Sequence, residues 1–334
     1  MAYQVLIIGC GAIAGGYDHD RSPEDWPLSH AGAIARDTRF ALAACVDPDH
    51  AARGAFVDRW TVPNWAGSLD GLDAEPGEYD LIVIASPTEC HAEHLEWALG
   101  QRPKAILCEK PLAKGYEPAF RLFHEAAQLK IPLAINYTRR WQPDINDLVE
   151  RARYGEEWGE LLSAVGTYSK GIVHNGSHMV DLMMMFAGPL EVHSVGPAVI
   201  DQWEDDPTVS AILTAKDRGQ PLHLVGSDSR AVTQFELVLN YEFGEIAIRD
   251  GGMRIEIRRA AEDPVTAGYR RLGAPISAPG RYPEAMSAAY DNMAGVIARK
   301  AHPKWGDYNG ISAQAICEQI RLIALETLTK DTPE

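Results

Sequence analysis

The sequence predicts an α/β protein with two domains, in which a doubly wound parallel sheet is followed by an α+β domain with a mainly antiparallel sheet. Up to residue 136, short apolar runs alternate with helical patterns, which is typical of parallel strands joined by crossover helices. Beyond that point most strand patterns follow one another directly, and several alternate apolar and polar residues. A chain of 334 residues is also long for a single hydrophobic core. We therefore place one domain at residues 1–137 and a second at residues 138–334.

The first domain is expected to contain parallel strands with helices between them. Most of its strand patterns are continuous apolar runs, such as YDLIVIA at 79–85, which suits strands buried on both faces. The strands are predicted at 3–8, 40–46, 62–65, 79–85, 104–108 and 132–136. The helices are predicted at 30–35, 51–60, 91–99 and 117–129.

The second domain is expected to be dominated by antiparallel strands. The alternation in RIEIR at 254–258 is typical of a sheet with one covered face. The strands are predicted at 160–169, 190–200, 208–215, 222–227, 233–239, 245–248 and 254–257. Helices are predicted at 143–154, 283–299 and 310–330.

Composition and charge restrict the classes of function. Apolar residues make up 46% and charged residues 23% of the chain, as in ordinary globular proteins. The formal net charge of −16 argues against a nucleic-acid partner and against anionic membrane surfaces, because both would repel it. The five cysteines are scattered without metal-ligand spacing, and no apolar run reaches the roughly 18 residues of a membrane span. The strand pattern begins without a leader segment, so we expect a cytoplasmic protein with free thiols and no resident metal.

A glycine-rich turn follows the first predicted strand. Gly9, Gly11 and Ala14 have the G-x-G-x-x-A spacing. In such a turn the first glycine permits a tight bend, the second lets the backbone approach a pyrophosphate, and the small third residue lets a helix pack closely. The backbone amides of the turn, including those of Ala12 and Ile13, then face the phosphates. The motif therefore predicts a dinucleotide-binding site.

Asp47 ends the second predicted strand. An acidic side chain at this place accepts hydrogen bonds from the ribose hydroxyls and repels a 2′-phosphate, and no arginine follows it directly. NAD is therefore favoured over NADP. Asp47 lies 38 residues after Gly9 (47 − 9), more than the usual ~20, and a polar insertion at 17–29 accounts for much of the excess. This insertion is either a lid near the cofactor or an inert surface loop.

The stretch KAILCEKPLA at 104–113 places charged residues where a core strand ends. Glu109 and Lys110 follow an apolar run directly and precede Pro111. At the carboxyl end of a strand in an open α/β sheet, such side chains face the ligand crevice. The alternative is a surface ion pair before a helix. The turn after the fourth strand offers hydroxyl groups and a fixed proline at the same edge: Ser86, Pro87 and Thr88.

A second segment with several polar residues lies in the second domain, before and at the start of an apolar run. It is KGIVHNGSHMVD at 170–181. His178 and Asp181 have helical spacing, and Asn175 is the expected N-cap of this helix. His174 and His178 are four residues apart, a spacing that places two imidazoles on one helix face. Three interpretations are considered: a metal site, which the absence of an H-E-x-x-H pattern and of a clear third ligand argues against, a core histidine with satisfied hydrogen bonds, and a general base facing a crevice.

Together these features resemble the Gfo/Idh/MocA family of oxidoreductases, which includes glucose–fructose oxidoreductase and inositol dehydrogenase. The resemblance covers most of the chain. It rests on residues 9–14, His30 and Ala31, Asp47, 85–88 with His91, 109–111, and 176–178 with Asp181. It implies an N-terminal Rossmann domain and a C-terminal domain with a large open antiparallel sheet. That sheet often forms the dimer face in the family, so a homodimer or homotetramer is expected.

The resemblance also implies roles for individual residues. Lys110 would lie beside the nicotinamide and hydrogen-bond the reacting sugar oxygen, and His178 matches the catalytic histidine. Many members have an aspartate four residues before that histidine, where this chain has His174, so either histidine could be the base. The implied cofactor-binding residues are Gly9, Gly11, Ala12, Ile13, Asp47, Ser86, Pro87, Thr88, His91, Glu109 and Lys110. The candidate substrate-binding residues are Lys110, Tyr137, Arg140, Trp141, Tyr168, Lys170, Asn175 and His178.

The expected activity is hydride transfer between NAD and a hydroxyl or ketone of a carbohydrate, cyclitol or nucleotide sugar. The expected partner is thus a small sugar-like molecule. Two alternatives are open: an NAD-retaining glycosidase or lyase of the same fold, and a non-catalytic NAD-sensing binding protein. A non-catalytic NAD-sensing protein would need neither Lys110 nor His178 for catalysis, so the presence of both residues argues against this alternative.

Overall fold

The computed structural model describes residues 2–154, 156–230, 232–303 and 306–330. The described residues form two compact units, one within the ranges Met1–Trp141 and Pro283–Ile311, the other within Gln142–Tyr282 and Ser312–Glu334. The predicted division at residue 137 differs from this, because residues 283–311 return to the first unit. The cause is α7 (Ala285–Ile297), whose apolar side chains belong to the core of the first unit.

The first unit is built on a six-stranded parallel sheet with the order β3-β2-β1-β4-β5-β6. Its strands are β1 (Tyr3–Ile8), β2 (Phe40–Val46), β3 (Asn64–Ala66), β4 (Leu81–Ile84), β5 (Ala105–Cys108) and β6 (Leu133–Ile135). The strand order reverses between β1 and β4. In open α/β sheets, ligands bind outside the carboxyl ends of the strands at such a point. The doubly wound parallel sheet predicted from the sequence is thus confirmed.

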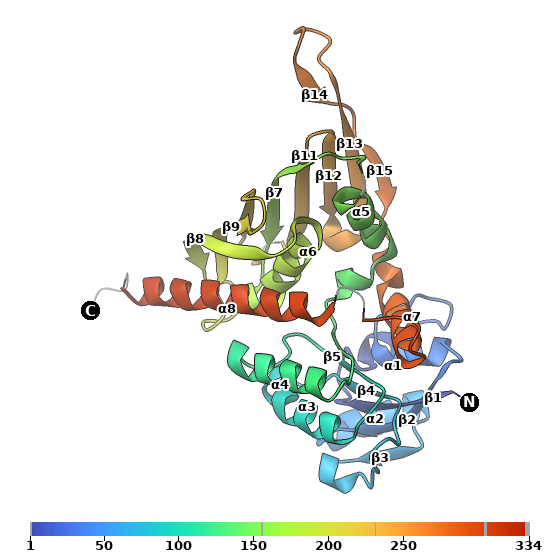
Figure 1. Ribbon diagram of the computed structural model, residues 1–334. Helices are drawn as coiled ribbons and strands as arrows, with labels where there is room; N and C mark the ends of the chain where they lie inside the picture. The colour runs from blue at the N-terminus through green and yellow to red at the C-terminus, as the bar shows by residue number, and fades with distance from the viewer. Residues whose placement is uncertain (1, 155, 231, 304–305, 331–334) are drawn as a thin grey trace. The chain divides into compact units, whose positions relative to one another are not determined.

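Helices flank this sheet (Figure 1). The helices α1 (His30–Arg36), α2 (His50–Trp60) and α7 share one apolar cluster with alternate residues of β1. The helices α3 (His91–Gly100) and α4 (Tyr116–Gln128) pack against each other and follow β4 and β5.

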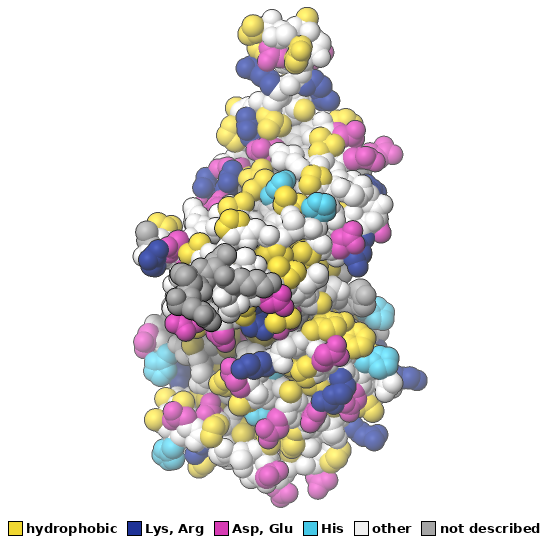
Figure 2. Space-filling view, turned by 90° about the vertical axis from the view of Figure 1, so that its left-hand side faces the viewer, with side chains coloured by type: hydrophobic (Ala, Val, Ile, Leu, Met, Phe, Trp, Pro, Cys, Tyr) yellow, Lys and Arg dark blue, Asp and Glu magenta, His cyan; other side chains and the backbone are white. Residues whose placement is uncertain are grey.

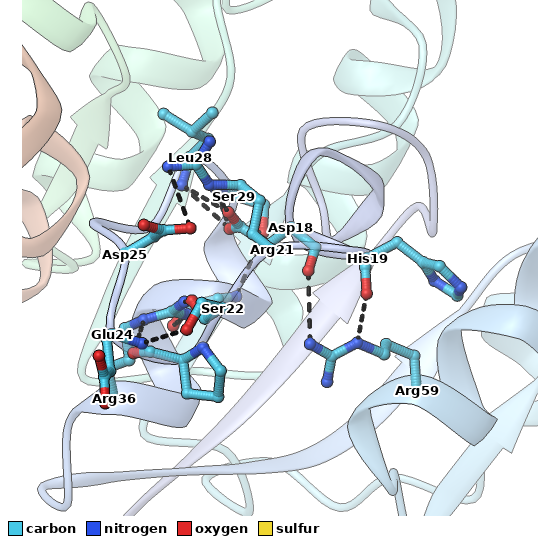
Figure 3. A network of polar contacts seen from close by, with 12 residues as sticks. Asp18, His19, Arg21, Ser22, Glu24, Asp25, Leu28, Ser29, Arg36 and Arg59 are labelled. Carbon is cyan, nitrogen blue, oxygen red and sulfur yellow. Dashed lines mark hydrogen bonds and ion pairs between the residues drawn. The ribbon is translucent and has the colours of Figure 1, made fainter.

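The insertion at 17–29 is closed on itself by a buried carboxylate (Figure 3). Asp18 is fully buried and accepts hydrogen bonds from the backbone amides of Leu28 at 3.0 Å and Ser29 at 2.8 Å. Arg36 of α1 donates to the Pro23 carbonyl, and Arg59 of α2 donates to the His19 carbonyl. These contacts hold both ends of the insertion and its middle, which favours a surface insertion over a lid.

The described residues of the second unit form a nine-stranded sheet with the order β14-β13-β12-β11-β7-β10-β9-β8, and β15 pairs with β13. The pairs are antiparallel except that β10 and β7 run parallel. The strands are β7 (Leu161–Tyr168), β8 (Leu190–Val199), β9 (Thr208–Ala215), β10 (Pro221–Gly226), β11 (Phe235–Tyr241), β12 (Gly244–Arg249), β13 (Arg254–Glu262), β14 (Arg270–Leu272) and β15 (Ile276–Pro279). The sequence prediction missed β14 and β15, because their residues are almost all exposed and form no continuous apolar run.

One face of this second sheet is covered and the other is open. The helix α6 (Ser177–Ala187) packs so closely that a Cβ added to Gly166 of β7 would lie 2.6 Å from the Met179 sulfur. On the opposite face, Leu162 and Val165 of β7 are 52% and 36% exposed. The other helices of this part are α5 (Pro143–Arg153) and most of α8 (Gly306–Lys330).

Acidic and basic side chains are intermingled on the face seen in Figure 2, so the negative net charge is not concentrated there in one patch. None of the helices in the described part of the chain combines the length and the apolar character needed to cross a bilayer.

Candidate active site

The glycine turn after β1 offers backbone amides that the protein does not use. The amides of Gly11, Ala12 and Ile13 donate to none of the described residues. Gly9 has φ +96°, and a Cβ there would lie 2.6 Å from the Ser86 backbone nitrogen, so only glycine fits. No described atom lies within 4 Å of a Cβ added to Gly11, which leaves room for an approaching group. Free donors beside an open backbone surface fit the phosphates of a dinucleotide.

Asp47 is fixed at the carboxyl end of β2. One carboxylate oxygen accepts a hydrogen bond from the Cys10 amide at 2.7 Å, and the other accepts one from the Asp49 amide at 2.8 Å. The first of these bonds joins Asp47 to the glycine turn. A cavity of about 430 Å³ lies beside both, lined also by Ser86, Pro87 and His94. This cavity fits the adenosine end of the dinucleotide, whose ribose hydroxyls would donate to Asp47.

The turn after β4 is connected to the turn after β5 by a buried histidine. The two ring nitrogens of His91 lie 2.8 Å from the Ser86 carbonyl oxygen and 2.7 Å from the Pro111 carbonyl oxygen. His91 is 1% exposed, so the structure gives it the role of holding these two turns. Ser86 also contacts His94, and burial lowers the pKa of His94. Contact of His91 with the cofactor stays a prediction.

Glu109 lies in a network of buried hydrogen bonds. The side-chain amide of Asn136 donates to a carboxylate oxygen of Glu109 at 2.6 Å, and His30 Nε2 lies 3.1 Å from the same oxygen. The other ring nitrogen of His30 lies 3.2 Å from the Tyr290 hydroxyl of α7. Burial raises the pKa of Glu109, but the hydrogen bonds from His30 and Asn136 and the charge of Lys110 outweigh it, so the pKa is lowered. The carboxylate next to Lys110 is therefore stabilised in its charged form.

Lys110 follows Glu109 at the carboxyl end of β5 and is partly exposed. Its peptide bond to Pro111 is cis. The chain is fixed on both sides of Lys110, because Glu109 is held by the buried network and the Pro111 carbonyl by His91. The sequence identified Glu109 and Lys110, but it did not identify Asn136 and Tyr290, which support them.

In the second unit, the segment before α6 is a π-helical turn, Gly171–Gly176. The prediction that Asn175 caps the following helix is wrong, because the N-cap is Gly176. The side-chain amide of Asn175 instead donates to the Ser169 carbonyl at 2.8 Å. His178 lies in the first turn of α6 and is partly buried. Lys170 directly precedes the π-helical turn, and its φ of +68° changes the direction of the chain after β7.

His174 is exposed in this π-helical turn, and its ring lies 4.4 Å from the ring of Trp203. The Asp206 carboxylate accepts hydrogen bonds from the backbone amides of Val173 at 2.8 Å and His174 at 2.9 Å. Burial raises the pKa of Asp206. Asp206 is not predicted from the sequence, because nothing in the sequence connects it with a turn more than thirty residues before it.

Among the candidate substrate-binding residues, Tyr168 is a correction. It is 0% exposed, and its hydroxyl donates to the Val209 carbonyl and accepts from the Val209 amide, both at 2.8 Å. Tyr168 is therefore a core residue that links β7 and β9. Trp141 is 2% exposed and donates to Asn136 at 2.8 Å, which places it in the core of the first unit. The Arg140 guanidinium lies over the Tyr137 ring, 5.1 Å from its centroid.

Comparison with known proteins gives consistent results. The family model described as an oxidoreductase family with an NAD-binding Rossmann fold matches residues 3–137. The chain is 25% identical over 339 residues to inositol 2-dehydrogenase 3 of Saccharopolyspora erythraea, covering 95% of this chain and 91% of that protein. It is 27% identical over 160 residues to glucose-6-phosphate 3-dehydrogenase of Bacillus subtilis, but this covers only 48% of this chain and 40% of that relative.

The fold itself is shared with solved structures. An oxidoreductase from Agrobacterium radiobacter, in complex with NAD+, L-tartaric acid and magnesium, has a TM-score of 0.75 and 16% sequence identity. The match covers 98% of this chain and 97% of that chain.

Proposed function

We propose that this chain, which belongs to the Gfo/Idh/MocA family of oxidoreductases, transfers a hydride between NAD and a hydroxyl or ketone of a carbohydrate, cyclitol or nucleotide sugar. The observation that supports this most directly is the arrangement at one edge of the first sheet. Unused amides of the glycine turn, the Asp47 carboxylate and Lys110 follow strands β1, β2 and β5 at their carboxyl ends. That combination provides phosphate donors, a ribose acceptor and a cation for the reacting oxygen.

NAD is favoured over NADP by the charges around Asp47. A 2′-phosphate would approach a carboxylate that the Cys10 and Asp49 amides already hold in place. The nearby Arg53 is 9% exposed, and its guanidinium donates to the Asp47 carbonyl and lies 5.4 Å from the Trp65 ring centroid. Arg53 is thus committed to the protein and does not provide a partner for a phosphate.

The chain's own groups then have the following roles. Lys110, as an ammonium, donates to the substrate oxygen and stabilises negative charge as the hydroxyl is oxidised. His178 takes the hydroxyl proton at an imidazole nitrogen, and His174 is the alternative base. In ketone reduction the same histidine returns the proton. Bound nicotinamide supplies the hydride chemistry, and the protein supplies position and charge.

The proposal is tested by turnover with a panel of sugars, cyclitols and nucleotide sugars in the presence of NAD+, followed by NADH absorbance. With an active substrate, Lys110→Ala should lower kcat by at least about 100-fold, as expected for loss of one donor to a developing oxyanion, while the Kd of NADH changes little. Lys114→Ala is the matched control, because Lys114 is an exposed lysine of the same turn. Full activity of Lys110→Ala would refute the assignment. Substrate conversion without net NADH would indicate an NAD-retaining lyase or glycosidase instead.

We also propose that the chain forms a homodimer or homotetramer in a reducing, cytoplasmic compartment. The open face of the second sheet presents exposed apolar side chains among polar ones, namely Leu162, Val165 and Val225, which is 39% exposed, and such a mixed sheet face is suited to pairing with a second copy. The five cysteines are all free. Sedimentation equilibrium of the wild type and of Val165→Lys tests this: a monomeric wild type would refute it, and the variant should dissociate.

A further inference from the structure

The first unit contains a basic cavity at the edge of the sheet opposite the candidate active site. Its volume is about 830 Å³. Lys104 and Pro132 line it and directly precede β5 and β6, so it lies at the amino ends of these strands. Lys110 and the glycine turn follow the carboxyl ends of strands in the same sheet. The cavity is therefore separate from the predicted cofactor site.

Four basic residues line this cavity, and no acidic residue is among its lining residues. They are Arg102, Lys104, Lys130 and Arg299. The side chains of Arg102, Lys130 and Arg299 are exposed and make no hydrogen bond or ion pair with the described part of the protein. Lys104 is partly neutralised, because its Nζ lies 2.7 Å from the Asp80 carboxylate. Three uncompensated positive charges thus meet in a chain whose formal net charge is −16.

The backbone at three of these residues is unusual. Arg102, Lys130 and Arg299 follow the ends of α3, α4 and α7, and their φ angles are +53°, +56° and +56°. Glycine is the usual residue in this left-handed conformation after a helix, because any Cβ is disfavoured there. The α6 helix of this chain is followed by a glycine with a positive φ, Gly188 at +82°. Long cationic side chains therefore stand at three positions where backbone geometry favours glycine.

A purely structural explanation exists for each residue taken alone. A cation near the end of a helix is stabilised by the negative end of the helix dipole. That explanation predicts effects on stability only. It does not explain why three helix ends place unpaired cations around one cavity that has an apolar floor. The floor is formed by Leu129, Ile131, Val296 and Ile297.

We propose that this cavity binds an organic polyphosphate, meaning a ligand with two or more phosphate groups on an apolar, ring-containing body. The volume is in the range of small-molecule sites. Arginine and lysine are the side chains that bind phosphate oxygens, arginine through a planar fork and lysine as a compact charge. The apolar floor then accommodates the ring, while Arg102, Lys130 and Arg299 reach the phosphates from three sides. Such a ligand adds a second binding site to the first unit, independent of the proposed oxidoreductase activity.

The test is calorimetric titration of ATP into the full-length protein already saturated with NADH, which keeps adenine nucleotides out of the cofactor site. We expect one additional ATP site per chain. The triple variant Arg102→Gln, Lys130→Gln and Arg299→Gln should weaken ATP binding at least about tenfold, since it removes three charge-assisted contacts. The control triple Lys216→Gln, Arg218→Gln and Arg271→Gln removes three exposed charges elsewhere and should change the affinity less than about twofold.

Two further arms distinguish the parts of the proposal. Inorganic tripolyphosphate should bind more weakly than ATP, and adenosine should not bind measurably. Equal affinity for ATP and tripolyphosphate would contradict the role of the apolar floor.

If the glutamine triple variant does not fold, two double variants replace it. Arg102→Lys with Arg299→Lys keeps the charges and should retain ATP binding, whereas Arg102→Gln with Arg299→Gln should weaken it. Absence of ATP binding to the NADH-saturated wild type, or equal loss in both triples, would overturn the proposal.

Discussion

The substitution His30→Ala tests whether the buried network sets the charge of Glu109. The His30 side chain is fully buried, and the Glu109 side chain is 13% exposed. Removing the imidazole leaves the carboxylate with the Asn136 amide and the charge of Lys110. A hydrogen bond to a charged group contributes about 1.5–3 kcal/mol, and removing the donor leaves the buried Glu109 carboxylate with one partner fewer, so its desolvation is less well compensated. We therefore expect His30→Ala to lower the free energy of unfolding by about 3 kcal/mol at pH 8.

A double-mutant cycle separates this coupling from the volume lost with the ring. The variants are His30→Ala, Glu109→Gln and both together, each unfolded in urea. We expect a coupling energy of about 2 kcal/mol, because the double variant no longer leaves a charge without its partner. The control cycle combines Glu109→Gln with His124→Ala, which changes an exposed histidine of α4. Here the two changes in the free energy of unfolding should simply add. A coupling energy within about 0.5 kcal/mol of zero for His30 would refute this account of the network.

The pH dependence of this coupling has a definite sign. The pKa of Glu109 is lower in the folded protein than in the unfolded chain. Its carboxylate therefore contributes stability that is complete above about pH 5 and is lost as the pH falls through the folded-state pKa. The coupling energy should be largest at pH 8 and decrease toward low pH. A coupling that grows on acidification would contradict the lowered pKa.

Three further substitutions test separate parts of the structure. Lys130→Gly should raise the free energy of unfolding by about 0.5–1 kcal/mol, because φ at this position is +56°; urea unfolding measures it, and a decrease would mean that the side chain stabilises the helix end. Asp47→Asn should lower the preference for NADH over NADPH about tenfold in the ratio of their Kd values, since one negative charge is removed, and an unchanged ratio would contradict the role of Asp47. Tyr168→Phe should cost about 1–2 kcal/mol of stability, because the hydroxyl bonds both backbone groups of Val209, and it should leave the KM of the substrate unchanged; a raised KM would return Tyr168 to the substrate site.

The sequence predicted the parallel sheet of the first unit well, because strands buried on both faces are continuous apolar runs. It assigned α7 to the wrong unit for a physical reason. An apolar helix face shows that the helix is buried, but it does not show which sheet it covers. Tyr290 of α7 contacts His30, 260 residues earlier in the chain, and no local pattern reports such a contact.

In the candidate site, the sequence predicted the side chains that are proposed to contact the cofactor. It did not predict the side chains that hold those residues in place. Glu109 and Lys110 stand out because charges follow an apolar strand. Asn136 and Asp206 do not, since a single polar residue beside apolar ones has many explanations. The one available signal is that a buried polar side chain needs a partner, and it leaves the partner unnamed. The hydrogen bond between Asn136 and Glu109 spans 27 residues, and that from the His174 amide to Asp206 spans 32.

The contacts that support Glu109 and Lys110 lie in one unit, and the contacts that support the turn with His174 lie in the other. His30, Asn136 and Tyr290, which hold Glu109 and thereby the chain beside Lys110, all belong to the first unit. Asp206, which holds the backbone of the His174 turn, belongs to the second. The charge state next to Lys110 is therefore set by contacts inside the first unit, and the shape of the histidine turn by contacts inside the second. A substitution that disturbs one of these sets changes one catalytic group while the contacts that position the other remain intact.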